Sequence, residues 1–329
     1  MPQDRPDAST IHRLSNSTYD SIALLAGLQL GVFSALADQS LTAGELASKL
    51  QASPAKLGPL LYLLTGAGLL TETDDCFANS DEADHYLVSG RPDYIGDRHL
   101  QWSQFWAAAL QTADTIRSGQ PQASHDFATL PPGEQEAYFR ALHPRAISTG
   151  SSFASETDLS AYTTILDTGC GSAGFAIGIA RECPGVRLCA GDLPSVLPIS
   201  RKFIAESDFA SIIETCAIDI LCEPVSGAYD AVILKNLLQV FSPEQAQMAL
   251  RNVSEGIVPG GHIYVMGDIL NDDRTSPHDV AGINLAIINL YTEGQAYTWG
   301  EYQTWLSGAG YTEIKICSDE TIRATWPGS

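Results

Sequence analysis

The sequence is poor in basic residues, and this shortage limits what the protein can bind. Lysine and arginine together number 18 against 39 aspartate and glutamate residues, which gives a formal net charge of −21 at pH 7. Such a surface repels nucleic-acid phosphates and anionic lipid headgroups, so we expect neither nucleic acid nor a membrane as a partner. The acidity itself fits an adaptation of the surface to solubility or salt. An anionic substrate would need its own local group of basic side chains.

Metal-binding cysteine pairs, a secretory signal and a membrane-spanning run are also missing from the sequence. The seven cysteines are scattered without a CxxC spacing, so we expect reduced thiols and no metal site. The longest nearly apolar run, residues 22–36, is too short to cross a bilayer and is interrupted by Gln29. The opening stretch MPQDRPDAST lacks the basic and apolar regions of a secretory signal. We therefore expect a cytoplasmic protein.

Residues 1–150 are predicted to form a mainly helical, winged-helix-like domain. Thr42 and Glu45 have the spacing of a capping box at the start of a helix. Residues 41–90 hold two basic and seven acidic side chains, a balance that disfavours DNA reading and favours a scaffold or dimerisation role. The expected elements are helices over 16–37, 43–50 and 54–67, a hairpin over 69–80, and helices over 102–117 and 134–147.

Residues 151–329 are predicted to form an α/β domain with a doubly wound, Rossmann-like parallel sheet. Apolar strand-like runs alternate with helical stretches, which is the βαβ pattern. Two strand-like runs at the end of the chain have almost no gap between them, so we expect an antiparallel hairpin that completes a seven-stranded sheet. The other expected strands are 163–169, 186–192, 211–219, 229–236 and 261–269, with helices that include 174–182 and 243–256.

A glycine-rich motif follows the first of these strands. The segment ILDTGCGSAGFAIGIA places Gly169, Gly171 and Gly174 in G-x-G-x-x-G spacing, and glycine is needed where backbone turns tightly and approaches a ligand. Asp192 ends the next strand, where a carboxylate can accept both hydroxyls of a ribose. Nicotinamide binding is the first alternative. The helical domain before the motif, the terminal hairpin, and Asp167 just before the first glycine argue against it.

The chain resembles the small-molecule O-methyltransferases of the plant caffeate type and their bacterial relatives, which use S-adenosylmethionine. The resemblance covers nearly the whole length and rests on the helical first domain and on LDTGCGSAGFAI, GDLPSV, AID, AVILKN, VPGGHIYV and GEYQTWLSGAGY. It implies S-adenosylmethionine as cofactor, S-adenosylhomocysteine as product, no metal, a small-molecule acceptor and a homodimer formed through the first domain. The cofactor-binding residues that it implies are Asp167, Gly169 and Gly171 at the methionine part, Asp192 at the ribose, Leu193, Asp219 and Ile220 around the adenine, and Lys235 nearby.

The catalytic residues of the resembled family are not matched. Gln239 stands where the family has its catalytic histidine, and Ala296 and Tyr297 stand at a Glu-Arg pair. Asp268 is a possible, shifted counterpart of a further carboxylate. A glutamine amide cannot act as a general base near neutral pH, and such a base typically contributes about 10²–10⁴-fold. An acceptor that needs no base is therefore indicated, unless His143 replaces the missing histidine and restores O-methylation.

We expect S-methylation of a thioether or thiol acid, such as 4-methylthio-2-hydroxybutyrate, by proximity and desolvation, because a thioether has no proton to lose. Arg140 or Arg145 would hold the carboxylate, or else pair with nearby glutamates on a solvated helix face. O-methylation, a cofactor-retaining hydroxylase, dehydratase or pericyclase, and a DNA-binding sensor of adenosylmethionine stay open. Gln239 and His143 are the candidate catalytic residues. The candidate substrate-binding residues are Trp102, Trp106, Tyr138, Arg140, His143, Arg145, Gln239, Asn289 and Tyr291.

Overall fold

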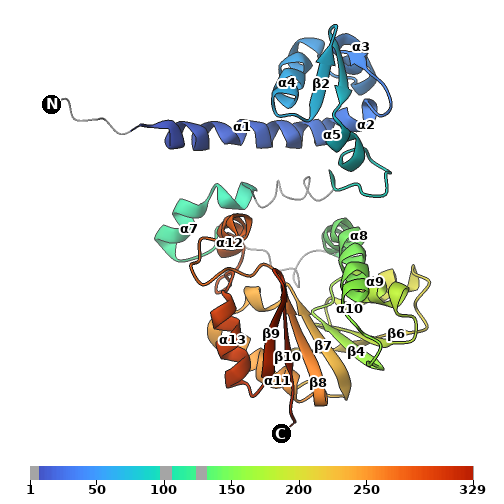
Figure 1. Cartoon of the computed structure of the whole chain (residues 1–329), viewed down its shortest axis with the longest axis vertical. Coiled ribbons are helices and arrows are strands. Elements are labelled where there is room, and N and C mark those ends of the chain that lie inside the picture. Colours follow the sequence, from blue (N-terminus) through green and yellow to red (C-terminus); the bar gives the residue numbers. More distant parts are fainter. Residues whose placement is uncertain (1–6, 97–105, 124–131, 329) are drawn as a thin grey trace, which may run out of the picture. The chain divides into compact units, whose positions relative to one another are not determined.

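The computed structural model describes residues 7–96, 106–123 and 132–328. The chain divides into two compact units, Met1–Gln104 and Phe105–Ser329 (Figure 1). Within the described residues, no helix combines the length and the apolar character needed to cross a bilayer.

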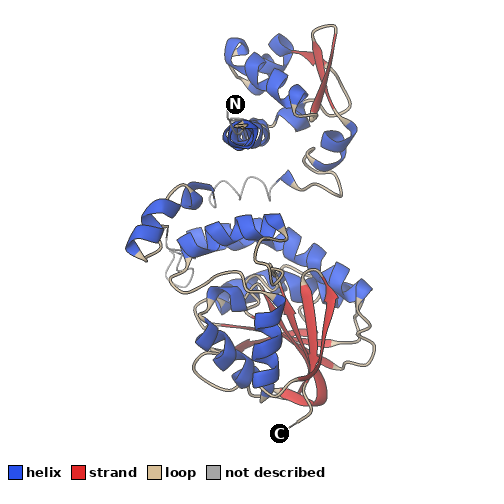
Figure 2. Cartoon of the chain, turned by 60° about the vertical axis from the view of Figure 1, so that its left-hand side comes forward, coloured by secondary structure: helices blue, strands red, loops and turns tan. Residues whose placement is uncertain are grey.

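The first unit is a group of helices with a small antiparallel sheet in strand order β1-β3-β2 (Figure 2). The predicted capping box is confirmed, because Glu45 N–H donates to Thr42 Oγ1 and Thr42 N–H donates to Glu45 Oε2. The predicted hairpin is confirmed as well. The elements are α1 (Ser9–Leu30), α2 (Val32–Ala35), β1 (Leu41–Thr42), α3 (Ala43–Leu50), α4 (Pro54–Gly66), β2 (Leu70–Thr73), β3 (Cys76–Asn79) and α5 (Asp81–Tyr86).

The helix predicted over 16–37 is longer at its start and is broken before its end. Gly31 adopts a left-handed backbone with φ of 74° and ends α1, and α2 begins at the next residue. Ala23, Gly27 and Leu28 form the buried side of α1. Leu24, Leu25 and Ala26 are partly buried, whereas Ile11, Leu14, Tyr19, Ile22 and Leu30 are exposed.

The second unit contains a seven-stranded sheet in the order β6-β5-β4-β7-β8-β10-β9. The predicted topology is confirmed, because β10 runs antiparallel to β8 and β9 and the other pairs are parallel. The strands are β4 (Thr164–Thr168), β5 (Arg187–Asp192), β6 (Ile213–Ala217), β7 (Tyr229–Lys235), β8 (Ile257–Met266), β9 (Thr312–Ser318) and β10 (Thr321–Thr325). The helices are α7 (Thr112–Ser118), α8 (Pro132–Glu156), α9 (Gly174–Glu182), α10 (Leu197–Ala205), η1 (Leu238–Val240), α11 (Pro243–Ser254), α12 (His278–Leu290) and α13 (Trp299–Gly308).

Helices cover both faces of this sheet, with α8, α9 and α10 on one side and α11 and α13 on the other (Figure 1). Strand β7 shows why. Val232 and Leu234 pack into the cluster that contains α11 and α13, whereas Ala231 and Ile233 pack into the cluster that contains α9. Successive side chains of a strand point to opposite faces, so a nearly continuous apolar run needs a cover on each side.

The division of the chain into two compact units falls between Gln104 and Phe105, earlier than the boundary at residue 150 that the sequence suggests. Helix α8 packs along α9, and α7 packs on α12, so both belong to the second unit by contact. The division into 1–150 and 151–329 is a statement about function and stays a prediction.

Two cysteines depart from the expectation of reduced thiols. Cys189 on β5 and Cys216 on β6 are joined by a disulfide, with their Cα atoms 6.6 Å apart. Adjacent parallel pairing of β5 and β6 brings them together across 27 residues. Among the described cysteines that stay free, Cys170 is buried, and Cys222 and Cys317 are exposed.

Candidate functional site

The glycine-rich motif forms the tight turn between β4 and α9. Gly169 and Gly171 have φ of 73° and 53°, a backbone region that favours glycine. The N–H groups of Gly169 and Cys170 both donate to the carbonyl of Gly191, at 2.8 and 3.1 Å. A Cβ atom on Gly171 would lie 2.7 Å from the ring of Phe139 on α8. The turn therefore keeps bare backbone at the carboxyl end of the sheet, under α8.

Asp167 at the end of β4 is a buried carboxylate with an unused oxygen. Its exposed fraction is 2%, and neither its Oδ2 atom nor the neighbouring Thr168 Oγ1 has a hydrogen-bond partner among the described residues. Burial raises the pKa of Asp167 to about 7, and the charge of Asp192 adds to the rise while Lys235 opposes it. Buried polar atoms without a partner are costly and rare. Their position beside the turn fits a bound ligand that carries a positive charge.

Asp192 at the end of β5 ties the turn to the next strand. Its Oδ2 accepts a hydrogen bond from Gly171 N–H at 2.8 Å, and its Oδ1 accepts one from Leu193 N–H at 2.7 Å. Each carboxylate oxygen has a second lone pair, so both can still accept from a ribose. Leu193 beside it is 36% exposed and offers an apolar surface to a planar ring.

Asp219 and Ile220 follow β6, the neighbour of β5. Ile218 N–H donates to the Asp192 carbonyl at 3.0 Å, which holds this segment beside the Asp192 end of β5. The Asp219 carboxylate accepts from Leu221 N–H at 3.0 Å and is half-buried. Ile220 is buried in the sheet core. The parallel topology thus brings Asp167, Asp192 and Asp219 to one edge, as the sequence predicts.

Lys235 ends β7, beside β4. Its Nζ lies 5.8 Å from the centre of the Phe175 ring, within the range of a cation–π contact. Burial lowers the pKa of Lys235, and the positive charge of Arg145 lowers it further, whereas Asp167 raises it. Lys235 and Asp167 are therefore buried close enough to each other to interact electrostatically. No group of three or more potential metal ligands occurs among the described residues.

His143 lies on α8, directly against the glycine-rich turn. Its Nδ1 is 2.9 Å from Ser172 Oγ, and its ring centre is 4.2 Å from that of Phe203. Burial lowers the pKa of His143 below its ordinary value. This position joins α8 to the turn, and the role of His143 as a base for the acceptor stays a prediction.

The two arginines of α8 have different surroundings. Arg140 pairs with Glu136 at 3.0 Å and with Glu206 at 3.3 Å, and its side chain is about half exposed. Arg145, by contrast, acts electrostatically on Lys235 and on Asp268. Arg140 is thus engaged in the surface ion pairs that the sequence left open as its alternative, and the two arginines do not form one clamp.

Gln239 and Asp268 are brought together at the carboxyl ends of β7 and β8. Gln239 lies on η1, close to the half-buried Asp268, and burial raises the pKa of the Asp268 carboxyl while the Gln239 amide lowers it. Gly267 permits this approach, since a Cβ atom there would lie 3.0 Å from Gln239 Oε1. The sequence marks Asp268 only as a shifted counterpart of a family carboxylate. Asp268 and Gln239 are 29 residues apart, so no local sequence pattern could have shown that they lie close together.

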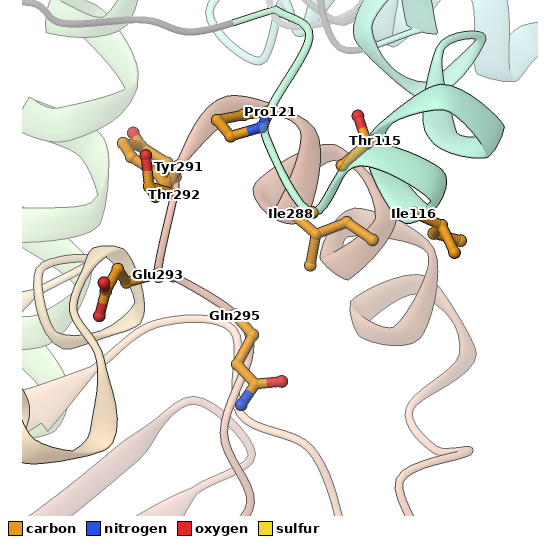
Figure 3. Close-up of a pocket in the computed structure, with 10 residues that line it drawn as sticks. Thr115, Ile116, Pro121, Ile288, Tyr291, Thr292, Glu293 and Gln295 are labelled. Carbon is orange, nitrogen blue, oxygen red and sulfur yellow. The ribbon is translucent and has the colours of Figure 1, made fainter.

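A cavity of about 350 Å³ lies between α7 and the segment that follows α12 (Figure 3). Gly294 in its wall abuts the Gln239 backbone, because a Cβ atom on Gly294 would lie 2.5 Å from the Gln239 carbonyl oxygen. Tyr291 also lines the cavity, and burial raises its pKa to about 12. The lining residues are Thr115, Ile116, Gly119, Pro121, Ile288, Tyr291, Thr292, Glu293, Gly294 and Gln295.

The remaining candidate substrate residues are not among those that line this cavity. Burial raises the pKa of Tyr138 on α8, and the nearby Tyr291 raises it further. Asn289 is fully buried and holds α7 onto α12, accepting from Thr115 Oγ1 and donating to Thr112 Oγ1 at 2.9 Å. Trp106 is half-buried. Trp102 lies outside the described residues.

The family comparisons agree with this geometry. Residues 118–312 match the O-methyltransferase domain, and residues 12–89 match the O-methyltransferase dimerisation domain. The 3-hydroxy-5-methyl-1-naphthoate 3-O-methyltransferase of Streptomyces sahachiroi is 28% identical over 96% of this chain and 91% of its own length. The tetracenomycin polyketide synthesis 8-O-methyl transferase of Streptomyces glaucescens is 25% identical over 93% and 91%. Human N-acetylserotonin methyltransferase in complex with SAM has the same fold, with a TM-score of 0.83, 22% identity and full coverage of both chains.

Proposed function

Because the chain belongs to the family of S-adenosylmethionine-dependent O-methyltransferases, we propose that it methylates a hydroxyl group of a small aromatic metabolite. The family makes the protein an enzyme that uses S-adenosylmethionine. Two relatives are named for O-methylation of a hydroxynaphthoate and in tetracenomycin synthesis, and the cavity beside Gln239 has room for an acceptor of that kind. The observation that carries the proposal is the unpartnered, buried Asp167 oxygen at the glycine-rich turn.

The residues of the turn suit S-adenosylmethionine, whose sulfonium supplies an electrophilic methyl group. The Asp167 carboxylate would accept from the cationic amine of the methionine part and so satisfy its unused oxygen. Asp192 would hold the ribose, with Leu193 and Asp219 beside the adenine. Phe139 of α8, which lies against Gly171, and the neighbouring Tyr138 would help to exclude water from the bound cofactor.

Gln239 does not remove a proton in this scheme, because its amide is neutral and a very weak base. Holding the acceptor oxygen in line with the methyl group can contribute roughly 7–11 kcal/mol through proximity and orientation. The amide of Gln239, which lies close to Asp268, would help to position the acceptor. Gly294 lines the cavity and packs against the Gln239 backbone, so Gln239 lies next to the space in which an acceptor would bind.

S-methylation of a thioether acid is the second candidate. The observation that favours it is Gln239 in the place of a base, since a thioether has no proton to lose. The carboxylate of an acid such as 4-methylthio-2-hydroxybutyrate would have to be met by Arg145, because Arg140 is paired with Glu136 and Glu206. A cofactor-retaining enzyme that does not transfer methyl is the third candidate and shares the same evidence from Gln239.

A panel of acceptors distinguishes these candidates. Purified protein and S-adenosylmethionine would be incubated separately with naphthols, catechols, free thiols and methylthio acids, and release of S-adenosylhomocysteine would be measured with the product mass. We expect turnover with the hydroxylated aromatics. Turnover with sulfur acceptors alone, with KM raised by Arg145→Ala and unchanged by Arg140→Ala, would favour the second candidate. Tight cofactor binding without any transfer would contradict both.

A further inference from the structure

Asn289 is a fully buried polar residue of α12 whose side-chain amide reaches across to α7. Its Nδ2 donates to Thr112 Oγ1 at 2.9 Å and to the Leu285 carbonyl at 2.6 Å, and its Oδ1 accepts from Thr115 Oγ1. The Leu285 carbonyl can only accept a hydrogen bond, so the amide nitrogen must face it and the amide oxygen is left for Thr115. Both N–H groups and the oxygen of this amide are therefore engaged within the protein.

The backbone of Asn289 makes a further link, to the chain that follows α7. Its carbonyl accepts from Ala123 N–H at 3.1 Å. Gly119 adopts a left-handed backbone with φ of 67° at the end of α7, which lets the chain turn so that Ala123 returns to α12. The segment of residues 112–123 is thus fastened to α12 at both of its ends, each time through Asn289.

This segment forms one side of the cavity of about 350 Å³ (Figure 3). The residues that it contributes to the lining are Thr115, Ile116, Gly119 and Pro121. Asn289 itself does not line the cavity. Of the described helices and strands, α12 is the one that α7 contacts most. Helix α7 has only seven residues, and an isolated helix of that length is unstable in water, so its place depends on these contacts.

We propose that Asn289 is a positioning residue that holds α7 in place as a wall of the cavity and so determines which acceptors fit. The inference rests on the proposed function, in which this cavity takes the acceptor. Without the amide, the hydroxyls of Thr112 and Thr115 lose their partner on α12, and the wall is in place for a smaller fraction of the time. The apparent affinity for an acceptor falls by that fraction. A bound acceptor restores the wall, so the transfer step itself changes little.

The test compares Asn289→Ala with the wild-type protein on 1-naphthol and on the smaller acceptor catechol. We expect KM for 1-naphthol to rise by about 10-fold or more, since a buried group left unpaired is costly, while kcat changes little. Catechol fills less of the cavity and needs the wall less, so its KM should rise less and the preference between the two acceptors should change. The Kd of S-adenosylhomocysteine, measured by calorimetry, should stay unchanged, because the side chain of Asn289 bonds to α7 and not to the glycine-rich turn.

A milder pair of variants keeps the test valid if Asn289→Ala does not fold. Thr112 does not line the cavity, and its hydroxyl accepts the hydrogen bond from Asn289. Thr112→Val should raise KM for 1-naphthol, whereas Thr112→Ser, which keeps the hydroxyl, should not. Adding Thr112→Val to Asn289→Ala should have little further effect, since both remove the same bond. The matched control is Thr304→Val on α13, where the hydroxyl donates to the Gly300 carbonyl of its own helix.

Amide hydrogen exchange followed by mass spectrometry gives a measurement that needs no acceptor. Asn289→Ala should speed exchange in α7 and leave exchange in α9 unchanged. Exchange in α7 equal to that of the wild type, or an unchanged KM and acceptor preference in both Asn289→Ala and Thr112→Val, would overturn the inference and leave the proposed function standing. Cofactor affinity that falls as much as acceptor affinity would also overturn it, because Asn289 would then support the whole domain. If the wild-type protein binds the cofactor and methylates no hydroxyl acceptor, the proposed function fails, and this inference fails with it.

Discussion

At the scale of single residues, the proposed role of Asp167 in cofactor binding has a consequence for the stability of the protein. Its folded-state pKa of about 7 lies above the ordinary value for aspartate. The folded state therefore holds this proton more tightly than the unfolded state does. The stability that comes from the protonated form is present at low pH and is lost as pH rises toward 7. A buried carboxylate retained at such a cost is typical of a functional site.

Asp167→Asn should accordingly raise the melting temperature of the cofactor-free protein, with the larger gain at pH 8 than at pH 5. The same change should weaken S-adenosylhomocysteine binding by about 10–100-fold, since a hydrogen bond to a charged group contributes roughly 1.5–3 kcal/mol. Thermal denaturation and calorimetry measure the two effects. A variant that is less stable at pH 8 than wild type would contradict the assignment.

Sequence patterns predict the residues of the turn better than the contacts across it. Gly169, Gly171 and Asp192 follow from a local motif at strand ends. Arg140 does not, because its partner Glu206 lies 66 residues away on another helix. His143 likewise finds Ser172 across 29 residues. The sequence identifies which side chains carry chemistry, and tertiary packing decides which of them face the acceptor.

At the scale of elements, the close packing of α8 on α9 determines where α8 lies over the glycine-rich turn. A Cβ atom on Gly150 would lie 2.2 Å from the Phe175 carbonyl oxygen, and one on Gly178 would lie 2.2 Å from the Ile147 carbonyl oxygen. These glycines let the two helix backbones approach closely. The same helix α8 carries Phe139, which lies against Gly171, so we expect the packing of α8 on α9 to affect cofactor binding at the proposed site.

Gly178→Ala should lower the free energy of unfolding by about 1–3 kcal/mol, the usual cost of overpacking, and should also weaken cofactor binding. Gly282→Ala on α12 is the matched control, because a Cβ atom there meets nothing within 4 Å. Denaturant unfolding and calorimetry check both. Equal stability for the two variants would show that α8 can shift without loss.

Helix α1 exposes apolar side chains on one side, as Ile11, Leu14, Tyr19 and Ile22 are 67%, 56%, 61% and 51% exposed. Exposed apolar patches mark interaction surfaces, and the match of residues 12–89 to a dimerisation domain supports a homodimer. The double change Leu14→Asp with Ile22→Asp should shift the protein toward monomer in light scattering. Ser17→Asp, elsewhere on the exposed part of α1, should leave the dimer intact. Unchanged mass for the double variant would exclude this face.

The order of the elements is readable from the sequence, whereas some of their ends are not. Helix α9 and the strands that surround the glycine-rich turn follow from apolar strand-like runs that alternate with helical stretches, with few exceptions. The break at Gly31 and the pairing of Cys189 with Cys216 depend on backbone conformation and on strand register. Both are set by tertiary structure rather than by local propensity.

At the scale of the whole molecule, the net charge of −21 dominates behaviour in solution. Charge of one sign repels itself and destabilises the compact state, and salt screens that repulsion over a Debye length of about 10 Å at 0.1 M. Raising sodium chloride from about 0.05 to 0.5 M, a range that shortens the Debye length, should raise the melting temperature. A melting temperature that falls over this range would show that attractive ion pairs, such as Arg140 with Glu206, outweigh the repulsion.

The proposed function is methyl transfer to oxygen, by a chain in which we predict that Gln239 stands in the place of a catalytic histidine. The most direct measurement uses S-adenosylmethionine with a carbon-13 methyl group and follows that carbon by NMR in a mixture of phenolic and thioether acceptors. The chemical shift of the labelled methyl reports the atom to which it is bound. We predict an oxygen-bound methyl that forms in proportion to S-adenosylhomocysteine. A label found on sulfur alone, or left on the cofactor by protein that binds it tightly, would contradict the account.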